Sequence, residues 1–401
     1  MRVAVFGAGA GGFFAAISAA RHHPAAEVTL YEKSDKVLSK VRISGGGRCN
    51  VTHDQRDPRR LSKHYPRGER FLRKAFERFA EEDTIAWFAA EGVSLRTESD
   101  GRMFPATNDS ATIVHALQEA ARRAGVVVRL RTGIQGLTRT GNGFTITNHG
   151  PPIHADRVIV STGGHPQVTS YAWLQALGHT IVEPVPSLFT FNIPNDPIRD
   201  LMGVALPARV RIAGTDLEST GPVLITHWGL SGPAILRLSA WGARLLHARD
   251  YQFVVQVNWL EGRSEEEVRR LFAEEAEALD RKQAHNADPF HLPKRFWDHQ
   301  LHKAGIAPDT PWGAVRKKER NRLIDLLTND RYEVKGKTTF KEEFVTAGGV
   351  ALDEVDPLTM QSRRCPGLYF AGEVLDIDGI TGGFNFQAAW TTGHIAGRSI
   401  A

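Results

Sequence analysis

The chain is poor in cysteine and has no long apolar run. Only two of its 401 residues are cysteines, Cys49 and Cys365, and neither lies in a CxxC pair. This excludes a disulfide-stabilised scaffold, a zinc ribbon and a dithiol centre of the CxxC type, so no metal site is expected. No apolar segment reaches the ~20 residues that a membrane-spanning helix needs. We therefore expect a cytoplasmic protein without a membrane partner.

Internal repeats and low-complexity linkers are also missing. Hydrophobic residues make up 41% of the chain and charged residues 24%, which is typical of a globular protein. The length allows two or three domains with a large core. The start, with Arg2 and an apolar, alanine-rich stretch, superficially resembles a secretory signal, but glycines interrupt it and we reject that interpretation.

The first 32 residues follow the order of a dinucleotide-binding βαβ unit. A short apolar strand, Val3–Phe6, leads into the glycine turn Gly7–Gly12, and an alanine-rich helix is expected over Phe13–Ala20. A second apolar run, Val28–Tyr31, ends on Glu32. This GxGxxG-to-acid spacing predicts a bound dinucleotide.

Each glycine of this turn, and the acid after the second strand, has a physical role. Gly7 allows a tight turn, Gly9 allows the backbone to approach a pyrophosphate, and Gly12 allows the helix to pack closely on the strand. The helix N-terminus offers N–H groups and partial positive charge to the phosphates. Glu32 is expected to accept hydrogen bonds from a ribose diol. The alternative is a glycine-rich turn without a ligand.

Further apolar runs alternate with helix-like segments in the first half of the chain. This alternation predicts a doubly wound, mostly parallel α/β sheet with an antiparallel excursion around a Gly141–Gly143 hairpin. Buried strands are expected over Val126–Leu130, Arg157–Ser161 and Gly367–Gly372, and helices over Phe71–Phe79, Thr84–Glu91, Ala111–Ala124 and about Asn385–Arg398.

The sequence pattern changes near residue 184, where prolines separate short apolar runs. We expect a discontinuous dinucleotide-binding domain over 1–184 and 346–401, a β-rich insertion over 185–262 and 330–345, and a helical subdomain over 263–329. Lys341–Val345 has strand character.

Glycine pairs recur at the ends of the apolar runs. They are Gly45-Gly46-Gly47, Gly163-Gly164, Gly348-Gly349 and Gly382-Gly383. Singly they favour tight turns, but together they suggest one extended ligand along the sheet edge, where the carboxyl ends of parallel strands bind ligands.

Two segments carry further candidate residues. In the loop that ends in Arg48-Cys49-Asn50, the backbone amides favour an anion site, Arg48 is expected to pair with a phosphate or ring edge, and Cys49 is either a packing residue or a redox thiol. Near the C-terminus, Glu373 is expected to accept from ribityl hydroxyls. A helix starting at Gly383 would point its N–H groups at a flavin ring.

These motifs resemble the YhiN/BaiN-like flavoproteins of bacteria, in the glutathione-reductase superfamily. The resemblance rests on Gly7–Gly12, Ser44–Asn50, Asp100–Pro105, Thr226–Pro233 and Gly372–Asn385 and covers essentially the whole chain. It implies non-covalent FAD on a Rossmann-like domain, an inserted β-rich domain and a helical subdomain. It also implies an NAD(P)/FAD-dependent oxidoreductase. Trp228 departs from the family pattern.

Motifs and resemblance together predict the cofactor-binding residues. They are Gly7, Gly9, Ala10, Gly11, Gly12, Glu32, Lys33, Gly46, Gly47, Arg48, Cys49, Asn50, Ile134, Gly163, Gly164, Gly372, Glu373, Gly382, Gly383, Phe384 and Asn385. Only one complete GxGxxG-to-acid unit is present, so NAD(P)H is expected to dock transiently beside the flavin, unless a substrate reduces the flavin directly. His227 is the candidate for acid–base work or substrate contact, and the alternative is a histidine that fixes its loop.

The expected function is hydride transfer between flavin N5 and a small organic substrate, NAD(P)H, or both. One alternative is a flavin-containing protein that binds nucleic acid, with FAD as a structural group or redox sensor. Another is a flavoprotein that modifies RNA. Nine basic residues between Arg56 and Arg78 either attract an anionic partner or form a solvated helix face. The second interpretation is favoured, so nucleic acid is not the expected partner.

Overall fold

The computed structural model describes residues 1–338 and 345–400. Contacts among the described residues divide the chain into two units. Unit 1 takes residues 1–187 and 345–400, and unit 2 takes residues 188–338. None of the helices in these two ranges combines the length and the apolar character that a bilayer crossing needs.

Unit 1 is built on a parallel five-stranded sheet, which confirms the predicted Rossmann-type α/β class. The strand order is β20-β10-β1-β2-β6, with every neighbouring pair parallel. The strands are β1 (Arg2–Phe6), β2 (Glu27–Tyr31), β6 (Val127–Arg129), β10 (Arg157–Val160) and β20 (Leu368–Phe370). Because β20 comes from the far end of the chain, the sheet closes only with C-terminal residues.

The predicted buried strand over Val126–Leu130 is wrong in its burial. The segment forms β6 at the sheet edge, where Val127 is 47% exposed and Leu130 44% exposed. A run of β-branched residues does not distinguish an edge strand from a central one, since both fit a pleated surface. The other two predicted central strands, β10 and β20, are largely buried, as expected.

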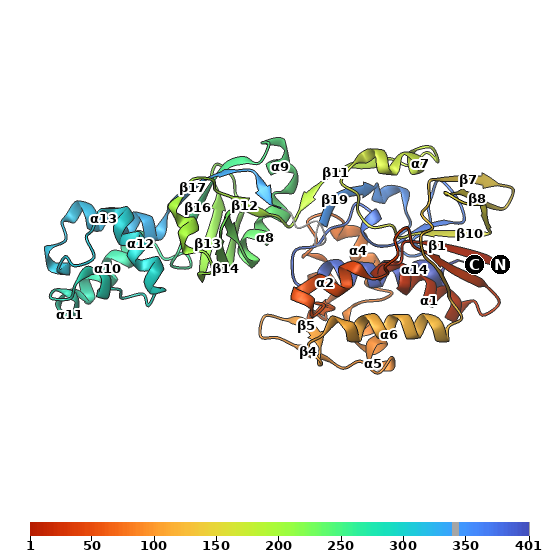
Figure 1. Cartoon of the computed structure of the whole chain (residues 1–401), viewed down its shortest axis with the longest axis horizontal. Coiled ribbons are helices and arrows are strands. Elements are labelled where there is room, and N and C mark those ends of the chain that lie inside the picture. Colours follow the sequence, from red (N-terminus) through yellow and green to blue (C-terminus); the bar gives the residue numbers. More distant parts are fainter. Residues whose placement is uncertain (339–344, 401) are drawn as a thin grey trace. The chain divides into compact units, whose positions relative to one another are not determined.

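The first helix, α1 (Ala10–His22), packs along the last one, α14 (Phe384–Arg398), although they come from opposite ends of the chain (Figure 1). Two glycines of α14 permit the approach. A Cβ on Gly393 would lie 2.4 Å from the Gly11 carbonyl oxygen, and one on Gly397 would lie 2.2 Å from that of Ala15. Small residues at this crossing therefore set the distance between the helices.

The helices and the hairpin that the sequence predicts in the rest of unit 1 are present with slightly different bounds, and several further short elements were not predicted. The helix expected over Phe71–Phe79 is α4 (Glu69–Ala75), which begins after Gly68 with φ +91°. The predicted hairpin around Gly141–Gly143 is confirmed by β7 (Gly136–Thr140) and β8 (Gly143–Thr147). The other elements are α2 (Ser39–Gly47), β3 (Thr52–His53), α3 (Pro58–Ser62), α5 (Glu81–Ala90), β4 (Leu95–Thr97), β5 (Arg102–Pro105), α6 (Ser110–Arg123), β9 (Ile153–Ala155), α7 (Ala172–Gln175), β11 (Ile181–Ser187) and β19 (Val345–Val350).

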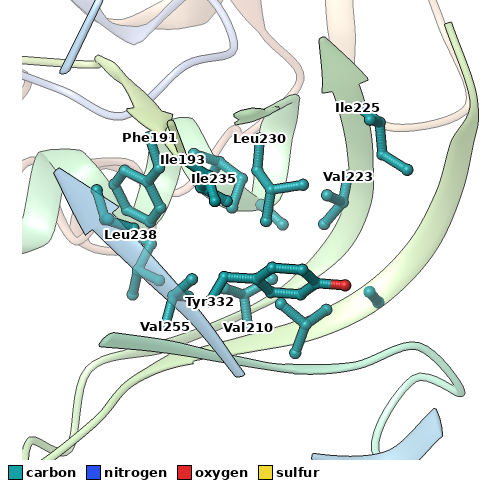
Figure 2. Close-up of a cluster of buried hydrophobic side chains, with 14 of the residues drawn as sticks. Phe191, Ile193, Val210, Val223, Ile225, Leu230, Ile235, Leu238, Val255 and Tyr332 are labelled. Atoms are coloured by element: carbon teal, nitrogen blue, oxygen red, sulfur yellow. The ribbon is translucent and has the colours of Figure 1, made fainter. Parts of the chain in front are cut away.

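Unit 2 contains a seven-stranded sheet in the order β17-β16-β13-β14-β15-β12-β18, with antiparallel pairs throughout. Strand β13 (Ala205–Ile212) alternates exposed and buried residues, so one face is solvated and the other packs on a core. Figure 2 shows this core, in which Phe191, Leu230 and Tyr332 are almost completely buried. The other strands are β12 (Thr190–Asn192), β14 (Glu218–Thr226), β15 (Gly229–Ser231), β16 (Gln252–Asn258), β17 (Asp330–Lys335) and β18 (Lys337–Thr338).

The helices of unit 2 lie between strands in the sequence, two between β15 and β16 and four between β16 and β17. They are α8 (Pro233–Trp241), α9 (Ala243–Ala248), α10 (Glu265–Glu274), α11 (Ala276–Leu279), α12 (Lys294–Ala304) and α13 (Lys317–Thr328). The last four pack around a second core that includes Trp297 and Trp312. Of the strand expected over Lys341–Val345, residues 341–344 lie outside the described residues, and β19 begins at Val345.

Candidate functional site

Four parallel strands of unit 1 end at the same edge of its sheet. Backbone hydrogen bonds join the residues at these ends: the Gly7 amide donates to the Tyr31 carbonyl (2.8 Å), and the Ser161 amide donates to the Phe6 carbonyl (2.8 Å). The Ala371 amide donates to the Val160 carbonyl (2.9 Å). The first glycine turn, the acid after β2 and the segments after β10 and β20 are thereby brought together. Ligands bind at this edge in doubly wound sheets.

The glycines of the first turn differ in what surrounds them. A Cβ on Gly12 would lie 1.8 Å from the Gly7 carbonyl oxygen, and one on Gly7 (φ +103°) would lie 2.2 Å from the Ser161 carbonyl oxygen. A Cβ on Gly9 would meet no heavy atom within 4 Å. Gly7 and Gly12 are therefore required by the fold, whereas the space at Gly9 is open. The helix N-terminus begins at Ala10, beside this space.

Glu32, the residue after β2, also stabilises the first glycine turn. Its Oε2 accepts a hydrogen bond from the Ala8 amide (2.9 Å), and its Oε1 accepts from the Ser34 amide and hydroxyl (both 2.9 Å). A carboxylate has about four acceptor positions, and these bonds use three of them. One acceptor position thus remains for a ligand hydroxyl.

Residues 131–133 lie alongside the residues that follow β2. The Arg131 amide donates to the Ser34 carbonyl (2.9 Å), the Thr132 amide donates to the Glu32 carbonyl (2.8 Å), and a Cβ on Gly133 would lie 3.0 Å from the Cβ of Lys33. Lys33 is thereby placed next to this segment, which continues into Ile134.

The segments after β10 and β20 meet at Glu373. Its Oε1 accepts from the Thr346 amide (2.9 Å), and its Oε2 pairs with the Lys40 ammonium (2.8 Å). A Cβ on Gly164 would lie 3.1 Å from that Oε1, whereas one on Gly163 (φ +76°) would meet nothing within 4 Å. Glu373 therefore links α2, β19 and the Gly163-Gly164 turn.

The triple glycine forms the end of α2 and leaves helical geometry. Gly45, Gly46 and Gly47 have φ angles of +59°, +69° and +84°, and a Cβ on Gly46 or Gly47 would meet no heavy atom within 4 Å. Gly47 and Cys49 are left-handed and Arg48 between them is right-handed, and such alternation turns successive amides to one side as a concave anion-binding surface. The glycines fit that role.

Arg48 is anchored by protein groups. Its Nη1 pairs with Glu98 (2.7 Å), its Nε donates to the Gly45 carbonyl (3.2 Å), and its guanidinium lies 4.0 Å from the ring centre of Phe104. Glu98 and Phe104 thus already supply the anion and the ring edge that the sequence led us to expect from a ligand.

Cys49 lies completely buried next to Arg48, with φ +59°. Burial raises the pKa of its thiol to about 12, although a hydrogen bond with Ser44 acts in the opposite direction. A thiol is a nucleophile only as a thiolate, so Cys49 is unreactive at neutral pH.

We expect Cys49→Ser to keep flavin reduction by NAD(P)H, at a stability cost of about 1–2 kcal/mol for a buried hydroxyl. Stopped-flow absorbance at the flavin band measures the first quantity and thermal unfolding the second. Loss of flavin reduction in a variant that still holds its flavin would assign Cys49 to the chemistry.

The head of α14 is held by the side chain of Asn50, which lies just before β3, and by a side chain from its own first turn. With its nitrogen donating to the Thr52 carbonyl, the Asn50 carboxamide accepts a hydrogen bond from the Gly383 amide (3.0 Å). Asn385 Oδ1 accepts from the Gly379 amide (2.8 Å), and its Nδ2 donates to the Gly379 carbonyl (2.9 Å). Asn50 and Asn385 therefore position the loop that precedes the helix.

The helix begins at Phe384, one residue after the expected start at Gly383, which serves as its N-cap. A Cβ on Gly383 would lie 2.5 Å from the Thr52 carbonyl oxygen, and one on Gly382 would lie 3.0 Å from the Phe384 ring. Close packing within the protein thus requires both glycines. The first N–H groups of the helix have no acceptor within it, as at any helix N-terminus.

Phe384 packs against two imidazoles, whose ring centres lie 6.0 Å from each other. Its ring centre is 4.6 Å from that of His53 and 4.4 Å from that of His64, both stacked, and the Tyr65 hydroxyl donates to its carbonyl (2.6 Å). His53 Nδ1 donates to the Gly382 carbonyl (3.1 Å). Burial lowers the pKa of His53 below its usual range, although this hydrogen bond acts in the opposite direction. His53 is therefore neutral at pH 7.

Close backbone packing explains why residues 348 and 349 are both glycine. In β19, a Cβ on either would lie 2.4 Å from a backbone carbonyl oxygen, of Glu183 or of Val374. The proposed contact of this pair with the ligand is replaced by close packing of β19 against its neighbours.

His227 lies in unit 2, in the turn between β14 and β15. Its carbonyl accepts from Arg199 Nε (2.6 Å), and its imidazole packs edge-on against Trp228. It borders an open hollow of about 480 Å³ that Asp196 and Arg199 also line. All predicted cofactor residues lie in unit 1, so the structure places His227 in a different unit from them.

Sequence reasoning missed several residues of the site. Lys40, Ser161, His53, His64 and Tyr65 contact the predicted residues from other elements. The only sequence signal was the position of Ser161 directly after an apolar strand. The Lys40–Glu373 pair spans 333 positions, and one sequence carries no signal for it.

Comparison with known proteins identifies the family of the chain and two relatives that match over nearly its whole length. A family model described as "HI0933-like protein Rossmann domain" matches residues 1–399. A "3-dehydro-bile acid delta(4,6)-reductase" from Clostridium scindens is 29% identical over 409 residues, covering 100% of this chain and 99% of the relative. A "Ribosomal RNA dihydrouridine synthase" from Escherichia coli K12 is 30% identical over 407 residues, covering 99% of this chain and 97% of the relative.

Solved structures share the fold at low identity. A 3-ketosteroid-delta4-(5alpha)-dehydrogenase from Rhodococcus jostii RHA1 matches with a TM-score of 0.51 and 15% identity, covering 99% of this chain and 96% of that one. A 3-ketosteroid delta1-dehydrogenase from Sterolibacterium denitrificans matches with a TM-score of 0.52 and 13% identity, covering 99% and 98%. At these identities the likeness concerns the fold alone.

Proposed function

The chain belongs to the HI0933-like Rossmann-domain family, and we propose that it is an FAD-dependent oxidoreductase that reduces a carbon–carbon double bond conjugated with a carbonyl group. The observation that carries this proposal is the convergence of four strand ends from both chain termini on one sheet edge. The reductant proposed is NADH or NADPH, which docks transiently because only one GxGxxG-to-acid unit is present.

The residues at this edge fit the adenosine diphosphate half of FAD. The open space at Gly9 lies at the N-terminus of α1, where N–H groups and partial positive charge favour a pyrophosphate. Glu32 keeps an acceptor position for a ribose hydroxyl. Lys33 and Ile134 are proposed to line the position beyond it, because the segment before Ile134 packs on Lys33.

The residues at the head of α14 fit the flavin half. FAD supplies hydride transfer at N5 when it is bound. The free N–H groups of the first turn of α14 would stabilise negative charge on the pyrimidine end of the ring, and Asn50 with Asn385 holds that turn in place. The backbone at Gly46, Gly47 and Gly163 is open to the approach of a ligand.

The substrate class is inferred from what the names of the relatives have in common. A 3-dehydro bile acid with a delta-4 double bond is an α,β-unsaturated ketone. Dihydrouridine is uridine saturated at a bond conjugated with a ring carbonyl. The first name thus describes the substrate and the second the product of one reaction type, in which hydride and a proton add across an activated double bond.

The test begins with the absorption spectrum of the purified protein and identification of the released chromophore. Rapid bleaching of the flavin by NADH or NADPH, followed by reoxidation with a 3-oxo-delta-4 steroid or uridine-containing RNA, is the expected result. A folded, colourless protein that does not take up FAD would contradict the proposal.

We expect Glu32→Ala to weaken FAD binding by about 1–3 kcal/mol, because it removes a charged acceptor from the ribose. Flavin fluorescence titration of the apoprotein measures the change in dissociation constant. Ser34→Ala is the matched control, since it removes one hydrogen bond to Glu32 and leaves the carboxylate in place. Equal dissociation constants for Glu32→Ala and the unmodified protein would contradict the ribose assignment.

A second candidate function is reduction of a uracil base within RNA. A specific observation favours it: the relative named as a ribosomal RNA dihydrouridine synthase is 30% identical over nearly the whole chain. The two candidates share their chemistry and differ only in the size and charge of the substrate.

A further inference from the structure

Residues 56–78 of unit 1 carry a concentrated positive charge. Nine basic and three acidic residues give this segment a net charge of +6, against +5 for the whole chain. The rest of the protein is therefore close to neutral. Neither FAD nor a steroid needs a cationic face of this extent.

Most of these cations are exposed and have no ion-pair partner. Arg59, Lys63, Arg70, Arg73, Lys74 and Arg78 are exposed and make no ion pair with any residue in 1–338 or 345–400, whereas Arg56 and Arg60 pair loosely with nearby acids. We call these eight residues the basic face. It lies on α3 and α4 and their flanking turns, and its apolar side, including Leu72 and Phe76, is buried.

The basic face is fixed to the loop that leads into α14. Between α3 and α4, the His64 carbonyl accepts from the Ile380 amide (3.0 Å), and Arg67 forms a bidentate ion pair with the buried Asp378. Tyr65 donates to the Phe384 carbonyl, as described above. Helix α4 also packs against α14. The turn between α3 and α4 thus adjoins the head of α14, where the flavin ring is proposed to lie, and the basic face flanks this turn on both sides in the sequence.

We propose that the basic face binds the phosphates of an RNA strand and thereby presents one of its uracil bases to the flavin. The inference rests on the proposed reductase function and departs from the expectation that nucleic acid is not a partner. Phosphate contacts from arginine and lysine set the position and orientation of a nucleic acid, while the base itself is recognised elsewhere. A polyanion is the partner that six unpaired cations on one face match in charge.

The test compares two triple variants of the FAD-bound protein. Arg70→Gln/Arg73→Gln/Lys74→Gln removes three cations of the basic face. Lys317→Gln/Lys318→Gln/Arg322→Gln removes three exposed cations from one helix of unit 2, which also make no ion pair with the described residues. The probe is a fluorescein-labelled, uridine-containing single-stranded RNA of about 25 nucleotides, followed by anisotropy at several salt concentrations.

We expect the α4 variant to bind RNA about 10- to 100-fold more weakly at low salt, and its slope of log K against log salt to fall by about 2. The α13 variant should bind within about twofold of the unmodified protein. Equal losses in both variants, or binding of phosphatidylglycerol vesicles in place of RNA, would overturn the inference. Flavin absorbance of each variant reports that unit 1 is folded.

The same preparations separate this inference from the reductase proposal. An unmodified protein that reduces a 3-oxo-delta-4 steroid with NADPH but does not bind RNA would overturn the inference and leave the reductase standing. One that binds RNA through α4 but whose flavin NADH and NADPH do not reduce would support the inference and overturn the reductase.

Discussion

Gly9→Val should yield a folded protein that has lost its flavin. A Cβ at this position meets no heavy atom within 4 Å, and the φ of −89° at Gly9 suits an L-residue, so we expect the fold to accept a small side chain there. In the FAD complex the same space is proposed to hold the pyrophosphate, and two methyl groups would displace it. We expect the dissociation constant for FAD to rise at least about 100-fold, which is roughly 2.7 kcal/mol. Flavin content after gel filtration and fluorescence titration of the apoprotein measure the loss.

Gly12→Val is the control that distinguishes ligand contact from folding. Its Cβ would lie 1.8 Å from the Gly7 carbonyl oxygen, so this variant should fail to fold, whereas the thermal midpoint of apo Gly9→Val should stay within about 2 °C of the unmodified apoprotein. A yellow Gly9→Val protein with one flavin per chain would refute the placement of the pyrophosphate.

Gly393→Val should destabilise unit 1 by roughly 3 kcal/mol and weaken flavin binding at the same time. Its first side-chain atom would lie 2.4 Å from the Gly11 carbonyl oxygen and 3.0 Å from the Cβ of Phe14, so α14 must move away from α1. Because the head of α14 and the N-terminus of α1 both border the proposed cofactor, their displacement affects both halves of FAD.

Chemical denaturation of the apoprotein, followed by flavin titration, measures the two effects of Gly393→Val separately. Arg398→Val places the same β-branched side chain at an exposed position of the same helix and should change the unfolding free energy by less than about 1 kcal/mol. Equal stabilities for the two variants would show that the helices tolerate a wider spacing.

The first βαβ unit could be predicted from the sequence because its signals are local. The motif spans only 26 positions and consists of Gly7, Gly9, Gly12 and Glu32. The backbone geometry that each of these positions requires is set by neighbouring residues. The same holds for the hairpin at Gly141–Gly143. The glycine pairs were only partly predictable, since Gly46 and Gly163 face open space while Gly348 and Gly383 face backbone carbonyls. Glycine serves both ligand approach and close backbone packing, and its presence in the sequence does not distinguish the two roles.

The rest depends on contacts between distant segments. The exposure of β6 follows from its place at the sheet edge, which a run of valines does not reveal. The packing of Phe384 against His53 and His64 requires β3 and the turn after α3 to meet α14, although both lie over 300 positions away in the sequence. Arg48 shows the converse: its type suggests a ligand contact, and tertiary packing supplies Glu98 instead.

The parallel sheet of unit 1 takes strand β20 from the last tenth of the polypeptide, whereas unit 2 is one continuous stretch. During translation, the nascent chain can complete the core of unit 2 on the ribosome while β10 still lacks its neighbour β20 and α1 still lacks α14. Cofactor loading is then a post-release event. A ribosome stalled near codon 380, whose exit tunnel still covers β20, should display a protease-resistant unit 2 beside an N-terminal part that remains sensitive to digestion.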